Sequence, residues 1–235
     1  MAERKDFTDN FIRAMFLPDR CSLCGKPVVF RTKVCKNCIK TAKFIKDKIC
    51  PACGLPEKSC KCGKKANFYS SITAPFIYTG VVRQGISLWK FKKFYRNVDY
   101  FAEMIADSVT RNLDGENFDV ITFIPQTKQE SKKRTYNQGQ ILAEKTGEIL
   151  NIPVMPLLTK LYDTQRQHNL PHIARSGNIF GVFDVCNIPM TEGKNILLID
   201  DIKTSGKTIN ECAKMLQLYN AESVHCAVIA IAEKQ

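Results

Sequence analysis

Eight of the eleven cysteines are gathered in four close pairs between residues 21 and 62. Three pairs have the spacing C-x-x-C and the last has the spacing C-x-C; the residues are Cys21, Cys24, Cys35, Cys38, Cys50, Cys53, Cys60 and Cys62. A C-x-x-C turn points two thiolates at one metal ion, and a second turn completes a tetrahedral site. The spacing therefore predicts one or two structural zinc ions, with no open position for water.

The pairing of these turns is not decided by spacing alone. Sequential pairing gives one site from the first four cysteines and a second site from the last four. A cross-braced arrangement, in which the turns alternate between two ions, stays open. Residues 1–66 contain few large apolar side chains, so bound metal must supply much of their folding free energy.

The net charge of +12 is distributed along the chain as unevenly as the cysteines are. Residues 1–70 hold 16 Lys and Arg against 6 Asp and Glu, hence +10, while residues 71–235 hold 19 against 17, hence +2. Both asymmetries predict a zinc-binding module of residues 1–66, of double zinc ribbon type, followed by a second domain of residues 67–235. The basic module is the likelier surface for a polyanion such as single-stranded DNA.

The chain shows no sequence feature of membrane insertion or export. Its apolar run AVIAIA, residues 227–232, is too short to span a bilayer. The charged residues 1–16 lack the apolar core of a signal peptide. We expect a cytoplasmic protein, and in that reducing compartment clustered cysteines favour metal over disulfides.

Residues 67–235 alternate strand-like and helix-like patterns. The expected strands are residues 71–78, 118–125, 195–201 and 223–232, and the expected helices are residues 98–113, 138–150 and 207–221. Residues 195–199 are apolar after the first position, as in a strand buried on both faces. The alternation predicts an α/β domain with a mainly parallel sheet flanked by helices.

The stretch NILLIDDIKTSGKT, residues 195–208, places two acids at the end of this buried strand. Ligands of open α/β sheets bind beyond the carboxyl ends of the strands. The loop Thr204–Thr208 can surround a monophosphate with N–H groups and hydroxyls, at the positive end of the next helix. Asp200 and Asp201 then accept hydrogen bonds from ribose hydroxyls, which together predicts a ribose 5-phosphate site. A nucleotide-triphosphate P-loop is excluded, because Asp201 stands where that motif needs glycine.

Several stretches resemble known families. Residues 196–208 resemble the phosphoribosyl pyrophosphate (PRPP) signature of type I phosphoribosyltransferases. The start RCSLCG with the later cysteine pairs is similar to the zinc module of the ComF family, which is competence-linked and phosphoribosyltransferase-like. Residues 88–94, 124–138 and 164–185 also resemble stretches of that family, with Thr135-Tyr136 replacing its usual Gly-Phe. The resemblance implies a type I phosphoribosyltransferase-like fold.

The resemblance also implies roles for individual residues. Asp200 and Asp201 are the expected catalytic residues. The expected PRPP-binding residues are these two acids with Ile202, Lys203, Thr204, Ser205, Gly206, Lys207 and Thr208. The expected pyrophosphate loop contains Pro125, Gln126, Thr127, Lys128 and Arg134, and the expected lid contains Gln167, Asn169, Arg175 and Asn178. Mg²⁺ is expected to bind with PRPP. Three alternatives stay open. The basic loop is a solvated surface loop, the segment with the lid residues is an extended structural connection, and Asn137 and Gln138 cap the following helix.

Two functions follow from these patterns. One is transfer of a phosphoribosyl group from PRPP to an unknown acceptor, with release of pyrophosphate, in DNA uptake. The other is a non-catalytic adaptor whose zinc module binds single-stranded DNA or a DNA-uptake helicase or channel. Residues 88–94 interleave aromatic residues with lysines, which suits either stacking on nucleic acid or an amphipathic element. His225, Cys212 and Cys226 are expected in the core.

Overall fold

The computed structural model describes residues 19–63, 66–92, 96–126, 137–161 and 182–233. Among these residues no helix has both the length and the apolar character needed to cross a bilayer.

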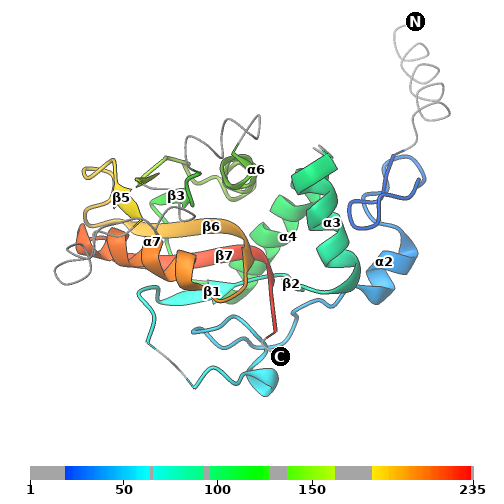
Figure 1. The fold of residues 1–235 in the computed structure, drawn as a ribbon, viewed down its shortest axis with the longest axis horizontal. Coiled ribbons are helices and arrows are strands. Elements are labelled where there is room, and N and C mark those ends of the chain that lie inside the picture. Colours follow the sequence, from blue (N-terminus) through cyan, green and yellow to red (C-terminus); the bar gives the residue numbers. More distant parts are fainter. Residues whose placement is uncertain (1–18, 64–65, 93–95, 127–136, 162–181, 234–235) are drawn as a thin grey trace, which may run out of the picture.

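A parallel sheet forms the centre of the molecule (Figure 1). Its strands are β1 Ser71–Thr73, β2 Phe76–Ile77, β3 Val120–Phe123, β6 Asn195–Lys203 and β7 Ser223–Ile231. The order is β1-β7-β6-β3, and β2 also pairs with β7. The long strand β6 lies between β7 and β3 and is parallel to both, so its backbone is paired along both edges.

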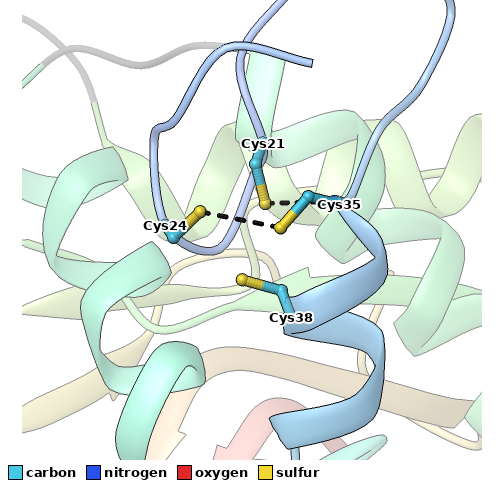
Figure 2. Close-up of side chains that lie close together, drawn as sticks. All are labelled: Cys21, Cys24, Cys35 and Cys38. Atoms are coloured by element: carbon cyan, nitrogen blue, oxygen red, sulfur yellow. Dashed lines mark hydrogen bonds between the residues drawn. The ribbon is translucent and has the colours of Figure 1, made fainter. Parts of the chain in front are cut away.

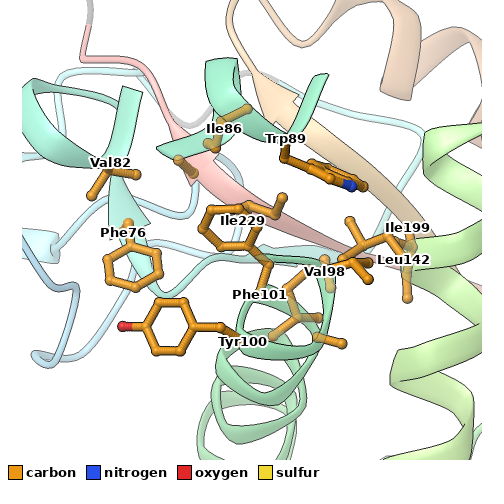
Figure 3. Close-up of a cluster of buried hydrophobic side chains, with 14 of the residues drawn as sticks. Phe76, Val82, Ile86, Trp89, Val98, Tyr100, Phe101, Leu142, Ile199 and Ile229 are labelled. Atoms are coloured by element: carbon orange, nitrogen blue, oxygen red, sulfur yellow. The ribbon is translucent and has the colours of Figure 1, made fainter. Parts of the chain in front are cut away.

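The apolar residues of β6 point alternately into two cores. Leu197 and Ile199 belong to the first, and Ile196 and Leu198 belong to the second. The first core is covered by α3 Gly80–Lys92, α4 Arg96–Asn112 and α6 Gln138–Leu150. Figure 3 shows Trp89 of α3 and Phe101 of α4 within it. A strand with apolar residues on both faces requires cover on both sides.

The second core is covered by α7 Lys207–Leu218 and by an antiparallel hairpin of β4 Leu158–Lys160 and β5 Phe183–Val185. The prediction of an α/β fold with a mainly parallel sheet and flanking helices is confirmed. His225, Cys212 and Cys226 are buried, as expected.

Three details differ from the sequence prediction. The expected strand 71–78 is interrupted, although β1 and β2 keep one continuous register against β7. Pro75 has no N–H to donate at this point. Residues 80–92 form the helix α3, which was not among the expected helices and includes the start of the stretch 88–94 that the sequence left open, and the β4-β5 hairpin was not expected. Trp89 is buried on α3 while Phe91 is 70% exposed, so the described part of this stretch is an amphipathic helix.

The cysteine-rich region packs directly against the α/β domain. It contains the short helix α2 Lys36–Thr41 and the 3₁₀ turn η1 Glu57–Ser59. Cys21 and Leu23 are fully buried in the same core as Trp89. Asn97 of α4 donates to the Ser22 carbonyl at 2.9 Å. The first cysteine turn is therefore part of the main core.

Gly85 allows this close approach. A Cβ built on Gly85 lies 2.7 Å from the Ser22 carbonyl oxygen and 2.8 Å from Leu23 Cα. Both are backbone atoms, which have no flexible end to move away. Because Gly85 has no side chain, α3 can lie directly against the backbone of the first cysteine turn.

We expect Gly85→Ala to destabilise the protein by about 1–3 kcal/mol through overpacking. At a helix position with open space around it, Gly→Ala stabilises the protein by about 1 kcal/mol. The sign of the change in stability therefore shows whether Gly85 is closely packed. Denaturant unfolding measures it, with the exposed helix position Ser87→Ala as the control. A stabilised Gly85→Ala variant contradicts the close packing of α3 on the cysteine turn.

Candidate functional site

The eight clustered cysteines form two groups of four. In each group the sulfur atoms lie within 4.8 Å of one another, and the groups are those of sequential pairing: Cys21, Cys24, Cys35 and Cys38, then Cys50, Cys53, Cys60 and Cys62. Figure 2 shows the first group, with the sulfurs of Cys24 and Cys35 3.9 Å apart. The sulfurs of Cys50 and Cys62 are 3.8 Å apart. Zn–S bonds of about 2.3 Å in a tetrahedron place sulfurs about 3.8 Å apart. Both groups fit structural zinc.

The first C-x-x-C turn of each group, residues 21–24 and 50–53, has the same local geometry. Gly25 and Gly54 follow their turns with φ of 74° and 76°, a conformation that glycine adopts without strain. Their N–H groups donate to the Cys21 and Cys50 carbonyls at 2.8 and 2.7 Å. Burial raises the pKa of the Cys21 thiol, but backbone N–H groups led by that of Cys35 outweigh it and lower the pKa to about 7. A thiol of this kind readily becomes the thiolate that zinc requires.

A pocket of about 310 Å³ lies at the carboxyl ends of β3 and β6. Asp200 and Asp201 line it from β6, and Thr208 lines it from the start of α7. Pro125 and Gln126 line it from the segment after β3. The pocket therefore brings together described residues from the two segments in which the sequence predicted ribose and pyrophosphate contacts.

The two adjacent acids have different environments. Asp201 pairs with Lys90 of α3 at 2.5 Å, and both side chains are about four-fifths buried. Burial and the neighbouring Asp201 charge raise the pKa of Asp200 to about 8, although the Asp201 N–H and Lys90 act in the opposite direction. Near neutral pH the pair therefore carries less negative charge than two free carboxylates.

The loop before α7 has the backbone of an anion site. Gly206 is the N-cap residue of α7 and has φ of 76°. Thr204, Ser205, Lys207 and Thr208 are exposed around it. The first N–H groups of a helix have no partner within the helix, and they favour a bound anion. This geometry suits a monophosphate one sugar away from the acids.

The structure gives positions to Asn137 and Gln138, whose roles the sequence left undecided. The Asn137 side chain accepts from the Gln140 N–H and caps α6. Gln138 is buried and donates from Nε2 to the Lys90 carbonyl at 2.9 Å, so α6 is tied to α3. Lys160 of β4 also lines the pocket.

Seven of the predicted residues lie outside the described part of the chain, whereas Ile202 and Lys203 are the last two residues of β6. The seven are Thr127, Lys128 and Arg134 of the pyrophosphate loop, and Gln167, Asn169, Arg175 and Asn178 of the lid. Sequence reasoning did not single out Lys90 or Lys160. The signal for Lys90 was present, because it follows Trp89 in the stretch whose apolar-basic pattern was noted. The position of Lys160 depends on the unexpected β4-β5 hairpin.

Comparison with known proteins matches both parts of the chain. A family model described as a double zinc ribbon domain matches residues 12–67, and one described as a phosphoribosyl transferase domain matches residues 101–235. Competence protein ComFC of Bacillus subtilis is 26% identical over 194 residues, 78% of each chain. DNA utilization protein YhgH of Salmonella typhimurium is 24% identical over 218 residues, 88% of this chain and 95% of the relative.

Solved structures were compared as well. A glutamine PRPP amidotransferase from B. subtilis aligns with a TM-score of 0.42 and 20% identity, over 56% of this chain and 25% of that one. An adenine phosphoribosyltransferase from Thermoanaerobacter pseudethanolicus aligns with a TM-score of 0.38 and 17% identity, over 60% and 83% of the two chains.

The raised pKa of Asp200 has a consequence for stability. The ordinary pKa of the group is 3.8 and the folded value is about 8. As pH rises between these values, the unfolded chain loses this proton before the folded protein does, so the group increasingly destabilises the fold. Asp200→Asn removes the effect. We expect it to stabilise the protein by roughly 1–2 kcal/mol at about pH 8 and by little at about pH 4.

Thermal unfolding across this pH range measures the effect. Asp201→Asn is the matched control, because it breaks the ion pair with Lys90 and is not expected to stabilise. If the gain in stability from Asp200→Asn does not change with pH, the assigned environment of Asp200 is wrong.

Proposed function

Because the chain belongs to the phosphoribosyl transferase domain family, we propose that it binds PRPP and transfers the phosphoribosyl group to an acceptor, with release of pyrophosphate. The observation that supports this most is the end of β6, where two acids line a pocket beside a helix N-terminus. Relatives named competence protein and DNA utilization protein support a role in DNA uptake. The zinc ribbon then gives the enzyme a basic, metal-stabilised extension.

The chain's own residues account for binding of the ribose phosphate. Asp200 and Asp201 accept hydrogen bonds from the ribose hydroxyls, which are good donors to carboxylates. The 5′-phosphate sits in the Thr204–Thr208 loop, against the first N–H groups of α7. The acids are thereby kept one sugar away from the phosphate, which avoids repulsion.

The leaving pyrophosphate needs positive charge around it. Lys160 lines the pocket, and Lys90 forms an ion pair with Asp201, which also lines the pocket. Cations placed where negative charge develops lower the barrier to transfer. The two carboxylates at the end of β6 are hard oxygen ligands that fit Mg²⁺. When bound, Mg²⁺ supplies further charge neutralisation for the pyrophosphate.

PRPP binding tests the proposal. The double change Asp200→Asn with Asp201→Asn should weaken PRPP and ribose 5-phosphate at least about tenfold, because the charge-assisted hydrogen bond to Asp201 is lost and the hydrogen bond to Asp200 is weakened. Inorganic phosphate, which touches only the loop, should keep its affinity. Gly206→Val should impair all three ligands, because its φ of 76° excludes a branched side chain.

Calorimetric titration of the three ligands measures these effects. Pyrophosphate release from PRPP, assayed with candidate acceptors, tests turnover separately. If the double Asn variant binds PRPP as well as the wild-type protein does, the ribose role of the two acids is refuted.

A second candidate function, an adaptor that binds single-stranded DNA, is favoured by the loop between the two cysteine turns of the first group. Val29 is 79% exposed there and Phe30 is 47% exposed. The Arg31 guanidinium lies 5.5 Å from the centre of the Phe30 ring. An exposed aromatic ring beside a cation suits base stacking next to a phosphate. This surface belongs to residues 1–70, which carry the +10 imbalance, and it is compatible with PRPP binding elsewhere.

We expect Phe30→Ala to weaken binding of a short single-stranded oligonucleotide about tenfold, because stacking contributes about 1–3 kcal/mol per base. Phe30→Tyr keeps the aromatic face and serves as the control. Affinity should also fall steeply with salt through counterion release. Fluorescence anisotropy measures both, and equal affinities of the Ala and Tyr variants would remove Phe30 from the contact surface.

A further inference from the structure

The second cysteine turn lies against the elements that carry the phosphate loop. Three consecutive carbonyls of this turn accept hydrogen bonds from the α/β domain. The Ile72 N–H donates to Pro51 at 3.0 Å, and the Tyr69 hydroxyl donates to Ala52 at 2.8 Å. The third carbonyl, that of the zinc ligand Cys53, accepts from Lys203 Nζ at 3.2 Å.

Lys203 contacts both the cysteine turn and the phosphate loop. It is the last residue of β6 and is only 9% exposed. Its stem lies against Gly206, since a Cβ on Gly206 would be 3.0 Å from Lys203 Cε and 3.8 Å from its Cδ and Cγ. The methylene groups of Lys203 therefore pack against the phosphate loop, while its ammonium group contacts the second cysteine turn.

A second connection runs parallel to the first. The Phe68 N–H donates to Asn210 Oδ1 at 2.8 Å, and Asn210 lies in the first turn of α7. The neighbouring Asn67 donates from its side chain to the Ala52 carbonyl at 2.9 Å. The segment that leaves the second cysteine group thus holds the cysteine turn and the start of α7 together.

Charge favours the same coupling. Four thiolates around one divalent ion leave two negative charges, which stabilise a buried ammonium group nearby. The ion also cross-links Cys53 to the other three cysteines of its group, and this holds the Cys53 carbonyl at its place. The first cysteine group packs on α3 and α4 instead.

We propose that Lys203 is a positioning residue that couples zinc in the second cysteine group to the phosphate loop, so that the loop binds the 5′-phosphate of PRPP well only when this ion is present. The inference rests on the PRPP-binding function proposed above. By linkage, a bound ribose 5-phosphate must also strengthen zinc retention at the second group by the same factor.

The first experiment changes Lys203. Lys203→Met keeps most of the stem and removes the charge and the donor, and it should weaken PRPP and ribose 5-phosphate about tenfold or more. Lys203→Arg restores both and should recover most of the affinity. Lys194→Met, at the opposite end of β6, is the matched control, since Lys194 pairs with Asp119 at 3.8 Å. Calorimetric titration on protein of verified zinc content measures all four proteins.

The second experiment needs no variant. A chromophoric chelator withdraws zinc from the wild-type protein with and without saturating ribose 5-phosphate. At equilibrium with the chelator, we expect the ligand to raise the apparent zinc affinity of one site about tenfold, as reciprocal coupling requires, and to leave the other site unchanged. In Lys203→Met the ligand should protect neither ion. Cys24→Ser, which disrupts the first group, should keep the protected ion, and Cys60→Ser should lose it.

The outcomes separate the two proposals. If wild-type protein binds PRPP but holds both ions with an equilibrium affinity independent of ligand, and Lys203→Met binds PRPP as wild type does, the coupling is overturned while PRPP binding stands. If zinc-loaded wild-type protein binds neither PRPP nor ribose 5-phosphate, the proposed function and the coupling are both overturned.

Discussion

The strand β6 is the element on which the rest of the structure depends, because it is paired along both edges and packed on both faces. Its apolar residues alternate between the core under α3, α4 and α6 and the core under α7. Such a strand has very little freedom to shift in register, since a slip by one residue would exchange the two cores. Its carboxyl end is therefore a rigid base for Asp200, Asp201 and Lys203.

This rigidity explains how two adjacent acids are held in different states. Asp201 is compensated by Lys90 from α3, whereas Asp200 has a raised pKa. Residues next to each other on a strand point to opposite faces, so one acid is reached by α3 and its neighbour is not paired in the same way. In the proposed PRPP complex, the ribose hydroxyls would meet one carboxylate that is already balanced by a cation. The arrangement reduces the repulsion that two free carboxylates would exert on a phosphorylated ligand.

The zinc ribbon adds stability where the apolar content of the chain is low. The first turn has the same geometry in both four-cysteine groups, yet the groups join the α/β domain at different places. The first adds Leu23 to the main core, and the second lies against β1 and the end of β6. The resemblance to the ComF family is confirmed by the two domain matches and by relatives at 24–27% identity. The division into residues 1–66 and 67–235 stays a prediction, as do the individual PRPP contacts.

The sequence by itself determined the features that depend on short-range pattern. The cysteine spacing predicted one or two four-cysteine zinc sites, because each turn is a local structure, whereas the structure decided the sequential pairing. The apolar run before Asp200 predicted a buried parallel strand, and helical periodicity located α4, α6 and α7 to within a few residues. Glycine and hydroxyl residues after that strand predicted the loop at the start of α7. All of these follow from residues close together in the chain.

Only the tertiary structure decided which distant residues meet. Lys90 reaches Asp201 across 111 positions of the sequence, and Lys203 reaches the Cys53 carbonyl across 150. Neither lysine has a local pattern that identifies its partner. Their partners are set by how α3 and the second cysteine turn pack on the sheet, and that packing depends on the fit of whole surfaces, as at Gly85. Long-range contacts of this kind are fixed by shape and burial, which a linear pattern of residue types does not encode.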